Sequence, residues 1–303
     1  MTGLILTAFA PVFVVIAAGY AIRASGWMPR PLWSGVNVLN YRVLLPAILF
    51  STTAGADIAG AAPIAAAAAV ATLIAAGLGL LGARLLSLPG KAAAPVASAG
   101  AAWNVVLVLA IAERLLGPDA ADAAAAAVGA GVVAGGLCFV TLFATLASNA
   151  GRARAVRRIA SDPVVIAALA GCAVSLSGLA LPGWLMDAFA AVGAGSLAVI
   201  LLAMGAGLDF AALKGRIAAL LTGALVRTIA GPVIFAGLAL AFGLKGEAFT
   251  LMVVAGAAPS AAFVYAMAAE FEAETGLAAG IITLTVLTSA IVMPIAAGLA
   301  LSL

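Results

Sequence analysis

The sequence predicts an all-α polytopic membrane protein with ten transmembrane helices. Of the 303 residues, 66% are hydrophobic and only 8% are charged, whereas soluble domains carry about 25% charged residues. The mean hydropathy is +1.29. A helix needs about 20 apolar residues to cross a bilayer, so a chain of this length has room for about ten crossings and their connections.

Ten apolar segments follow one another along the chain, separated by short connections that contain proline and glycine. Breakers of this kind stop helices where the chain leaves the bilayer, as in Leu88-Pro89-Gly90 and Leu181-Pro182-Gly183. The segments cover residues 3–22, 34–54, 62–86, 93–116, 123–147, 163–180, 186–208, 218–242, 248–269 and 276–302.

Lysine and arginine are distributed unevenly over the connections, and this distribution predicts the orientation. Because cytoplasmic loops carry the excess of these residues, we expect a multi-pass protein of the inner (cytoplasmic) membrane with both termini outside. Arg42 and Arg227 lie within segments, and topology leaves Arg227 unexplained. Ten of the 14 cations follow segments one, three, five and seven: Arg23, Arg30, Arg84, Lys91, Arg152, Arg154, Arg157, Arg158, Lys214 and Arg216.

The two halves of the chain share a sequence pattern. Residues 19–26 read GYAIRASG at the end of segment one, and residues 171–178 read GCAVSLSG at the end of segment six. Five segments per half place the second copy in the membrane upside down, an inverted repeat typical of transporters. We therefore divide the chain into a first repeat (1–150), a basic cytoplasmic loop (151–162) and a second repeat (163–303).

Several functional classes are excluded by composition. The chain has no histidine, and its two cysteines, Cys138 and Cys172, both lie inside apolar segments. We therefore expect no metal site, no cofactor and no catalytic residues. No nucleotide-binding motif is present, which argues against ATP-driven transport. The net charge of +3 follows from topology and does not indicate a nucleic-acid partner.

Segment two is the most polar of the ten. Asn37, Asn40 and Tyr41 are spaced three and four residues apart and would share a helical face. Pro46 weakens the helix at this point. Arg42 has two interpretations: it attracts an anion beside this polar face, or it extends to the cytoplasmic interface. Both asparagines and Arg42 are candidate substrate-binding residues.

Segment four contains an isolated polar residue near its middle. Asn104 follows Trp103, with Gly100 just before them. The amide could hydrogen-bond a carboxylate while the indole packs on the apolar part of a substrate; alternatively, Asn104 joins two helices. We favour the first interpretation and place a helix break at Gly100.

Segment nine carries breakers in its middle. Gly256 and Pro259 predict an interrupted helix whose exposed backbone N–H groups suit an anion, with Ser260 adding a hydroxyl. The hydroxyls of segment ten, including Thr285 and Ser289, are expected to bond within their own helix and to serve packing.

Three stretches resemble the auxin efflux carrier family in its compact bacterial form. They run from Gly19-Tyr20-Ala21 to Ile48-Leu49-Phe50, from Asp162-Pro163 to Ala206-Gly207-Leu208, and through Ala257-Ala258-Pro259-Ser260-Ala261. The resemblance implies two five-helix inverted repeats, with interrupted helices four and nine crossing mid-membrane beside a scaffold of helices one, two, six and seven. It also implies that Asn104 lies beside a substrate carboxylate at this crossing, that Pro259 is the breaker of helix nine, and that the protein forms a homodimer in the lipid bilayer. The family pattern has Gly and Pro flanking this asparagine, whereas residues 105–110 contain neither.

We therefore predict a secondary active transporter of small organic anions that works by alternating access and is driven by Na⁺, H⁺ or the membrane potential. Two alternatives are a ten-helix exporter of the drug/metabolite type and a non-transporting membrane receptor. Only the first prediction requires helices four and nine to cross in the middle of the bilayer.

Overall fold

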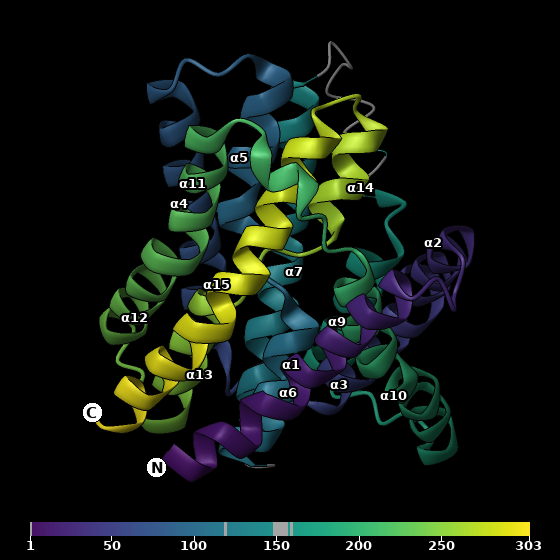
Figure 1. The fold of residues 1–303 in the computed structure, drawn as a ribbon. Coiled ribbons are helices and arrows are strands. Elements are labelled where there is room, and N and C mark those ends of the chain that lie inside the picture. The colour runs from purple at the N-terminus through teal and green to yellow at the C-terminus, as the bar shows by residue number, and fades with distance from the viewer. Residues whose placement is uncertain (1, 118–119, 148–156, 158–159) are drawn as a thin grey trace.

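The computed structural model describes residues 2–117, 120–147, 157 and 160–303, and these residues form helices and connections without a strand (Figure 1). Five helices run uninterrupted over at least 23 residues: α1 (Thr2–Ala24), α4 (Ala62–Leu85), α7 (Ala121–Leu146), α10 (Gly183–Ala206) and α15 (Thr275–Leu301). Together with residues 217–241, they give six helices long and apolar enough to cross a membrane. The predicted all-helical, multi-pass class is confirmed.

Helix ends follow the local sequence signals. Pro29, Pro89 and Pro182 occupy the N-cap positions of α2 (Arg30–Leu39), α5 (Gly90–Ala101) and α10, where a missing backbone N–H costs nothing. The carboxylate of Asp162 accepts from the first backbone N–H groups of α9 (Pro163–Ser177). The ends of the apolar segments are therefore specified locally.

Two helices continue through a wider, π-helical turn. The first consists of α2, η1 (Asn40–Leu44) and α3 (Leu45–Gly55), and the second of α11 (Ile217–Leu225), η4 (Val226–Ala230) and α12 (Gly231–Ala241). Pro46 and Pro232 follow these turns, and neither can donate the backbone hydrogen bond of a regular helix. The wider turn lets each helix continue past its proline.

Two further helices are interrupted completely. Helix α5 ends at Ala101, and α6 (Val105–Leu116) begins after residues 102–104. Helix α13 (Gly246–Ala257) ends before residues 258–262, and α14 (Phe263–Glu270) follows. These interruptions lie in the predicted segments four and nine. A short 3₁₀ turn, η3 (Ala211–Lys214), connects α10 to α11.

The helices pack as two groups that meet along one interface (Figure 1). In the first group α1 packs on α10, and α3 packs on both α9 and α10. In the second group α4 packs on α5 and α7, α12 on α13, and α11 on α15. Fully buried alanines of α4, such as Ala67, Ala71 and Ala75, allow its neighbours to approach closely. The two chain ends lie at the same end of the fold.

The expected basic loop at 151–162 falls largely outside the described residues. Three of its four arginines, Arg152, Arg154 and Arg158, are among the residues not described. The proposed boundaries at 150 and 163 and the cytoplasmic position of this loop therefore stay predictions.

Candidate functional site

The two interrupted helices cross at the irregular segments that join their halves, residues 102–104 and 258–262, which we call links. Trp103 and Ser260 pair in an antiparallel bridge. The backbone N–H of Asn104 donates to the carbonyl of Pro259 at 2.9 Å, and that of Ala261 donates to the carbonyl of Ala102 at 2.6 Å. Each link thus provides hydrogen-bond partners for backbone groups of the other link, which would otherwise be unpaired in an apolar interior.

The two links arise from different local causes. Pro259 cannot donate a helical hydrogen bond, and Ala258 before it is extended, at φ −62° and ψ 146°. The first link contains no proline. Asn104 is also extended there, at φ −79° and ψ 93°, and acts as the N-cap of α6. Its side-chain oxygen accepts from the backbone N–H of Leu107 at 3.0 Å, which restarts the helix.

Trp103 is held in one orientation by its neighbours. Its indole N–H donates to the hydroxyl of Thr72 at 3.2 Å, and its ring meets Phe235 edge-on at 5.9 Å between centroids. A Cβ atom at Gly131 would lie 2.1 Å from the indole, so only glycine fits there. Trp103 is 3% exposed.

Ser260 is fully buried at the crossing, and only its backbone is engaged. Its N–H donates to the hydroxyl of Thr285 at 3.1 Å, whereas its own hydroxyl has no hydrogen-bond partner in the described part of the chain. Ser289 donates to the carbonyl of Ala257 at 2.9 Å. The expectation that Thr285 and Ser289 only bond within their own helix is corrected here, because both support the break in α13–α14.

Arg227 of η4 is the charged group at the crossing, and its side chain is fully buried. Its guanidinium donates to the carbonyl of Gly100 at 2.8 Å, to that of Ala255 at 3.2 Å and to that of Gly256. It also lies 5.5 Å from the centre of the Phe235 ring. No carboxylate of the described residues forms an ion pair with it. The sequence signal, an arginine deep in an apolar segment, was present but assigned no role.

The polar residues predicted on segment two do not reach the crossing. The side chains of Asn37 and Arg42 are exposed on the outside of the fold. Asn40 is buried, but its side-chain oxygen accepts from the hydroxyl of Ser196 on α10 at 2.8 Å. Asn37 is exposed whereas Asn40 is buried, so the expected shared face does not form.

The predicted break residues contribute in different ways. Gly100 and Gly256 lie in the last turns of α5 and α13, where they supply carbonyls to Arg227 and allow close packing on neighbouring backbones. Pro259 lies in the break itself, and Pro46 follows the π-helical turn within a continuing helix.

Two cavities lie along the interface between the helix groups. The smaller, about 90 Å³, adjoins the crossing and contains the aromatic rings of Trp103, Phe139 and Phe263, with Tyr41 stacked on Phe263 at 5.4 Å. The hydroxyl of Tyr41 donates to the Asp162 carboxylate at 2.5 Å.

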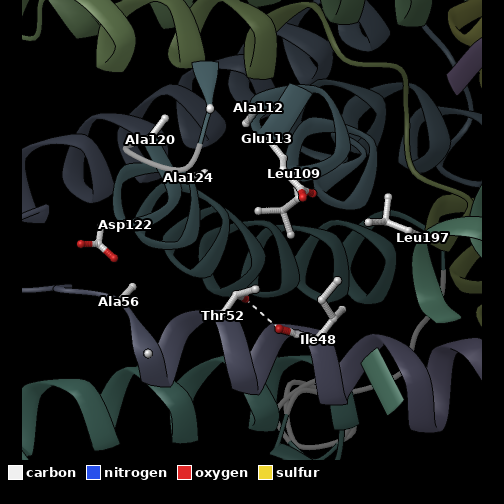
Figure 2. Close-up of a pocket in the computed structure, with 12 residues that line it drawn as sticks. Ile48, Thr52, Ala56, Leu109, Ala112, Glu113, Ala120, Asp122, Ala124 and Leu197 are labelled. Carbon is white, nitrogen blue, oxygen red and sulfur yellow. Dashed lines mark hydrogen bonds between the residues drawn. The ribbon is translucent and has the colours of Figure 1, made fainter. Parts of the chain in front are cut away.

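The larger cavity, about 260 Å³, does not touch the crossing residues. Figure 2 shows Leu109 and Glu113 of α6 on one side of it and Ile48 and Thr52 of α3 on the other. Asp122, near the start of α7, is the second acidic residue at its edge.

An all-helical membrane protein in which two interrupted helices cross has an architecture typical of membrane transport proteins. Residues 151–297 match the family described as membrane transport protein, an auxin efflux carrier-like family, and this match supports the predicted family assignment. The matched region covers α9 to α15 almost entirely, and the first half of the chain lies outside it. Comparison with curated proteins found no match.

Proposed function

We propose that this membrane transport protein is a secondary carrier of small organic anions that works by alternating access. The observation that carries this proposal is Arg227, a buried guanidinium at the crossing whose contacts are carbonyls and an aromatic ring, with no carboxylate among the described residues. Because Arg227 offsets the negative C-terminal ends of α5 and α13, the positive N-terminal ends of α6 and α14 are left to favour a negatively charged ligand.

The crossing also offers uncommitted hydrogen-bond donors to such an anion. The first N–H groups of a helix lack partners within the helix and carry partial positive charge. Helices α6 and α14 both begin at the crossing, and the N-cap of α14, Ala262, provides no side-chain cap. The hydroxyl of Ser260, which has no partner among the described residues, belongs to the residue that pairs with Trp103 just before α6. We place the anionic group there and the apolar body of the substrate against Trp103 and Phe263.

The two cavities fit an alternating route along one interface. Tyr41 and Leu45 line the smaller cavity, while Ile48 and Thr52, one to two turns further along the same helix, line the larger. The larger cavity adjoins the connection before α7 and the smaller one the start of α9 after it. Because α7 is long enough to span the bilayer, these connections belong to opposite sides. Movement of one helix group against the other would open the cavities in turn.

The architecture that we propose has ten crossings in two inverted five-helix repeats. The repeated eight-residue pattern supports it, because both copies make the same local bonds. Ser25 donates to the carbonyl of Ile22 at 2.9 Å, and Ser177 donates to that of Val174 at 2.8 Å. The glycines that close the two copies, Gly26 and Gly178, have φ of 73° and 67°.

The glycines that open the two copies, and a second pair of glycines outside the pattern, support the same repeat. Gly19 of α1 packs on the α10 backbone, and Gly171 of α9 packs on the α3 backbone, 152 residues later in the chain. Gly79 of α4 packs on α5, and Gly231 of α12 packs on α13, again 152 residues later. In both pairs the two glycines are separated by the same 152 residues, which favours a duplicated unit.

Purified protein in proteoliposomes tests the function. We expect uptake of labelled small carboxylates into substrate-loaded vesicles, competed by anions that have an apolar body. Preferential uptake of organic cations would support the exporter alternative, and absence of flux with any organic solute would support the receptor alternative.

Ser260→Ala tests the position of the site with little structural cost, since the hydroxyl that it removes has no partner. We expect a KM raised about 10-fold, the loss of one hydrogen bond to a charged group. The matched control is Ser196→Ala, which removes a buried hydrogen bond to Asn40 away from the crossing and should leave KM unchanged. A wild-type KM for Ser260→Ala contradicts this placement.

A further inference from the structure

Arg227 occupies the place where two half-helices end. Gly100 lies in the last turn of α5, and Ala255 and Gly256 lie in the last turn of α13. The carbonyls at a helix C-terminus have no partner within the helix and carry about half a negative charge in total. Two such ends that converge on one point present about one full negative charge.

The guanidinium matches this charge and these oxygen atoms. It carries one positive charge and donates to three terminal carbonyls from two helices that are distant in sequence. Its side chain is fully buried, so the charge cannot be screened by solvent. A Cβ atom at Gly231 would lie 2.8 Å from the guanidinium, so glycine at this position makes room for it.

In carriers with interrupted helices, the C-terminal ends of half-helices and unwound carbonyls are the groups that coordinate a coupling Na⁺. We infer that the Arg227 guanidinium acts as a built-in cation in this position, so that the crossing is charge-balanced without Na⁺ and transport does not depend on Na⁺. The part of this inference that concerns transport rests on the proposed function; the part that concerns the cation position does not.

The wild-type protein provides the first test. Thermal unfolding and carboxylate uptake are measured in NaCl and in N-methyl-D-glucamine chloride at equal ionic strength. We expect the same Tm and the same initial rate in both salts. A Tm or a rate that rises with Na⁺ overturns the inference.

Removal of the guanidinium provides the second test. Arg227→Ala leaves the terminal carbonyls without a cation, and we expect a Tm lower by about 5 °C or more. Adding Na⁺, or guanidinium at low millimolar concentration, should restore part of this loss. The control is Arg84→Ala, an exposed arginine at the end of α4, whose Tm should neither fall nor respond to cations. A stable Arg227→Ala variant, or one that responds to neither cation, overturns the inference.

Arg227→Lys keeps the test decisive if the alanine variant does not fold. Lysine retains the charge, so this variant should fold and stay independent of Na⁺, and a Na⁺ requirement in it would contradict the inference. Failure of the proposed function is recognised separately: no carboxylate flux occurs, while the thermal measurements with Na⁺ and guanidinium still report on the cation position.

Discussion

Asn104 combines a structural role with a proposed binding role, and substitution can separate the two. Its side-chain oxygen caps α6 through the N–H of Leu107 at 3.0 Å, while the amide NH₂ is the group that we expect to donate to the substrate anion. Serine is as good an N-cap as asparagine but has no amide NH₂. Asn104→Ser should therefore keep the cap and lose the donor, and Asn104→Ala should lose both.

The expected magnitudes follow from burial. Leu107 is fully buried, so loss of the cap in Asn104→Ala leaves a buried N–H unpaired, at a cost of about 1–3 kcal/mol in the free energy of unfolding. Asn104→Ser should stay within about 0.5 kcal/mol of the wild type, because the capping bond is retained. Loss of a hydrogen bond to a charged group, about 1.5–3 kcal/mol, raises KM by about 10- to 100-fold in both variants.

Two assays distinguish these effects. Thermal unfolding followed by tryptophan fluorescence reports on the cap, and carboxylate counterflow in proteoliposomes reports on binding. Asn104→Ser with wild-type stability and wild-type KM would refute the binding role. Asn104→Ser as unstable as Asn104→Ala would refute the assignment of the cap.

Two glycine substitutions test the packing around the crossing. In Gly256→Ala the new Cβ atom would lie 2.7 Å from the carbonyl oxygen of Gly231, a backbone atom that cannot move aside, so we expect a loss of about 1–3 kcal/mol or more in thermal unfolding. Gly237→Ala on α12, where nothing lies within 4 Å, is the control and should be neutral or slightly stabilising; equal behaviour of the two variants would contradict the packing. Gly131→Ala should displace Trp103, whose indole lies 2.1 Å from the new Cβ atom, and should change both tryptophan fluorescence and KM; an unchanged spectrum would argue against this contact.

The helical segments and one of the two interruptions could be predicted from local sequence. Long apolar runs must form helices in lipid because every backbone group needs a partner within the same segment. Pro259 cannot take part in such a helix, and the break in α13–α14 lies around it. The segment predicted at 163–180 corresponds to α9, which ends at Ser177 before a left-handed glycine.

The interruption between α5 and α6 could not be derived from its own residues. Residues 102–104 contain neither proline nor glycine, and α6 continues regularly from Val105. The link is stabilised by backbone bonds to Ala261 and Pro259, more than 150 residues away in the chain. Gly100 and the resemblance to a known family predicted a break in this segment, but the local residues do not place it at residues 102–104.

The sequence identified the polar residues of segment two but not the directions in which their side chains point. Helical spacing predicted a common face for Asn37, Asn40 and Tyr41. The structure does not show that face, and a π-helical turn covers Asn40–Leu44. Asn37 and Arg42 are exposed, while Asn40 accepts a hydrogen bond from Ser196 of α10. A binding role for Asn37, Asn40 and Arg42 stays a prediction that the fold does not favour.

Composition and the lengths of the apolar runs were enough to establish a helical, multi-pass membrane protein, because in lipid each segment must satisfy its own backbone. The electrostatics of the crossing depend on packing between distant segments. Arg227 meets the ends of α5 and α13 only after α12 has packed on α13 and the two links have paired. No local pattern specifies that meeting, since the carbonyls that receive the charge become available only where two helices end at the same point.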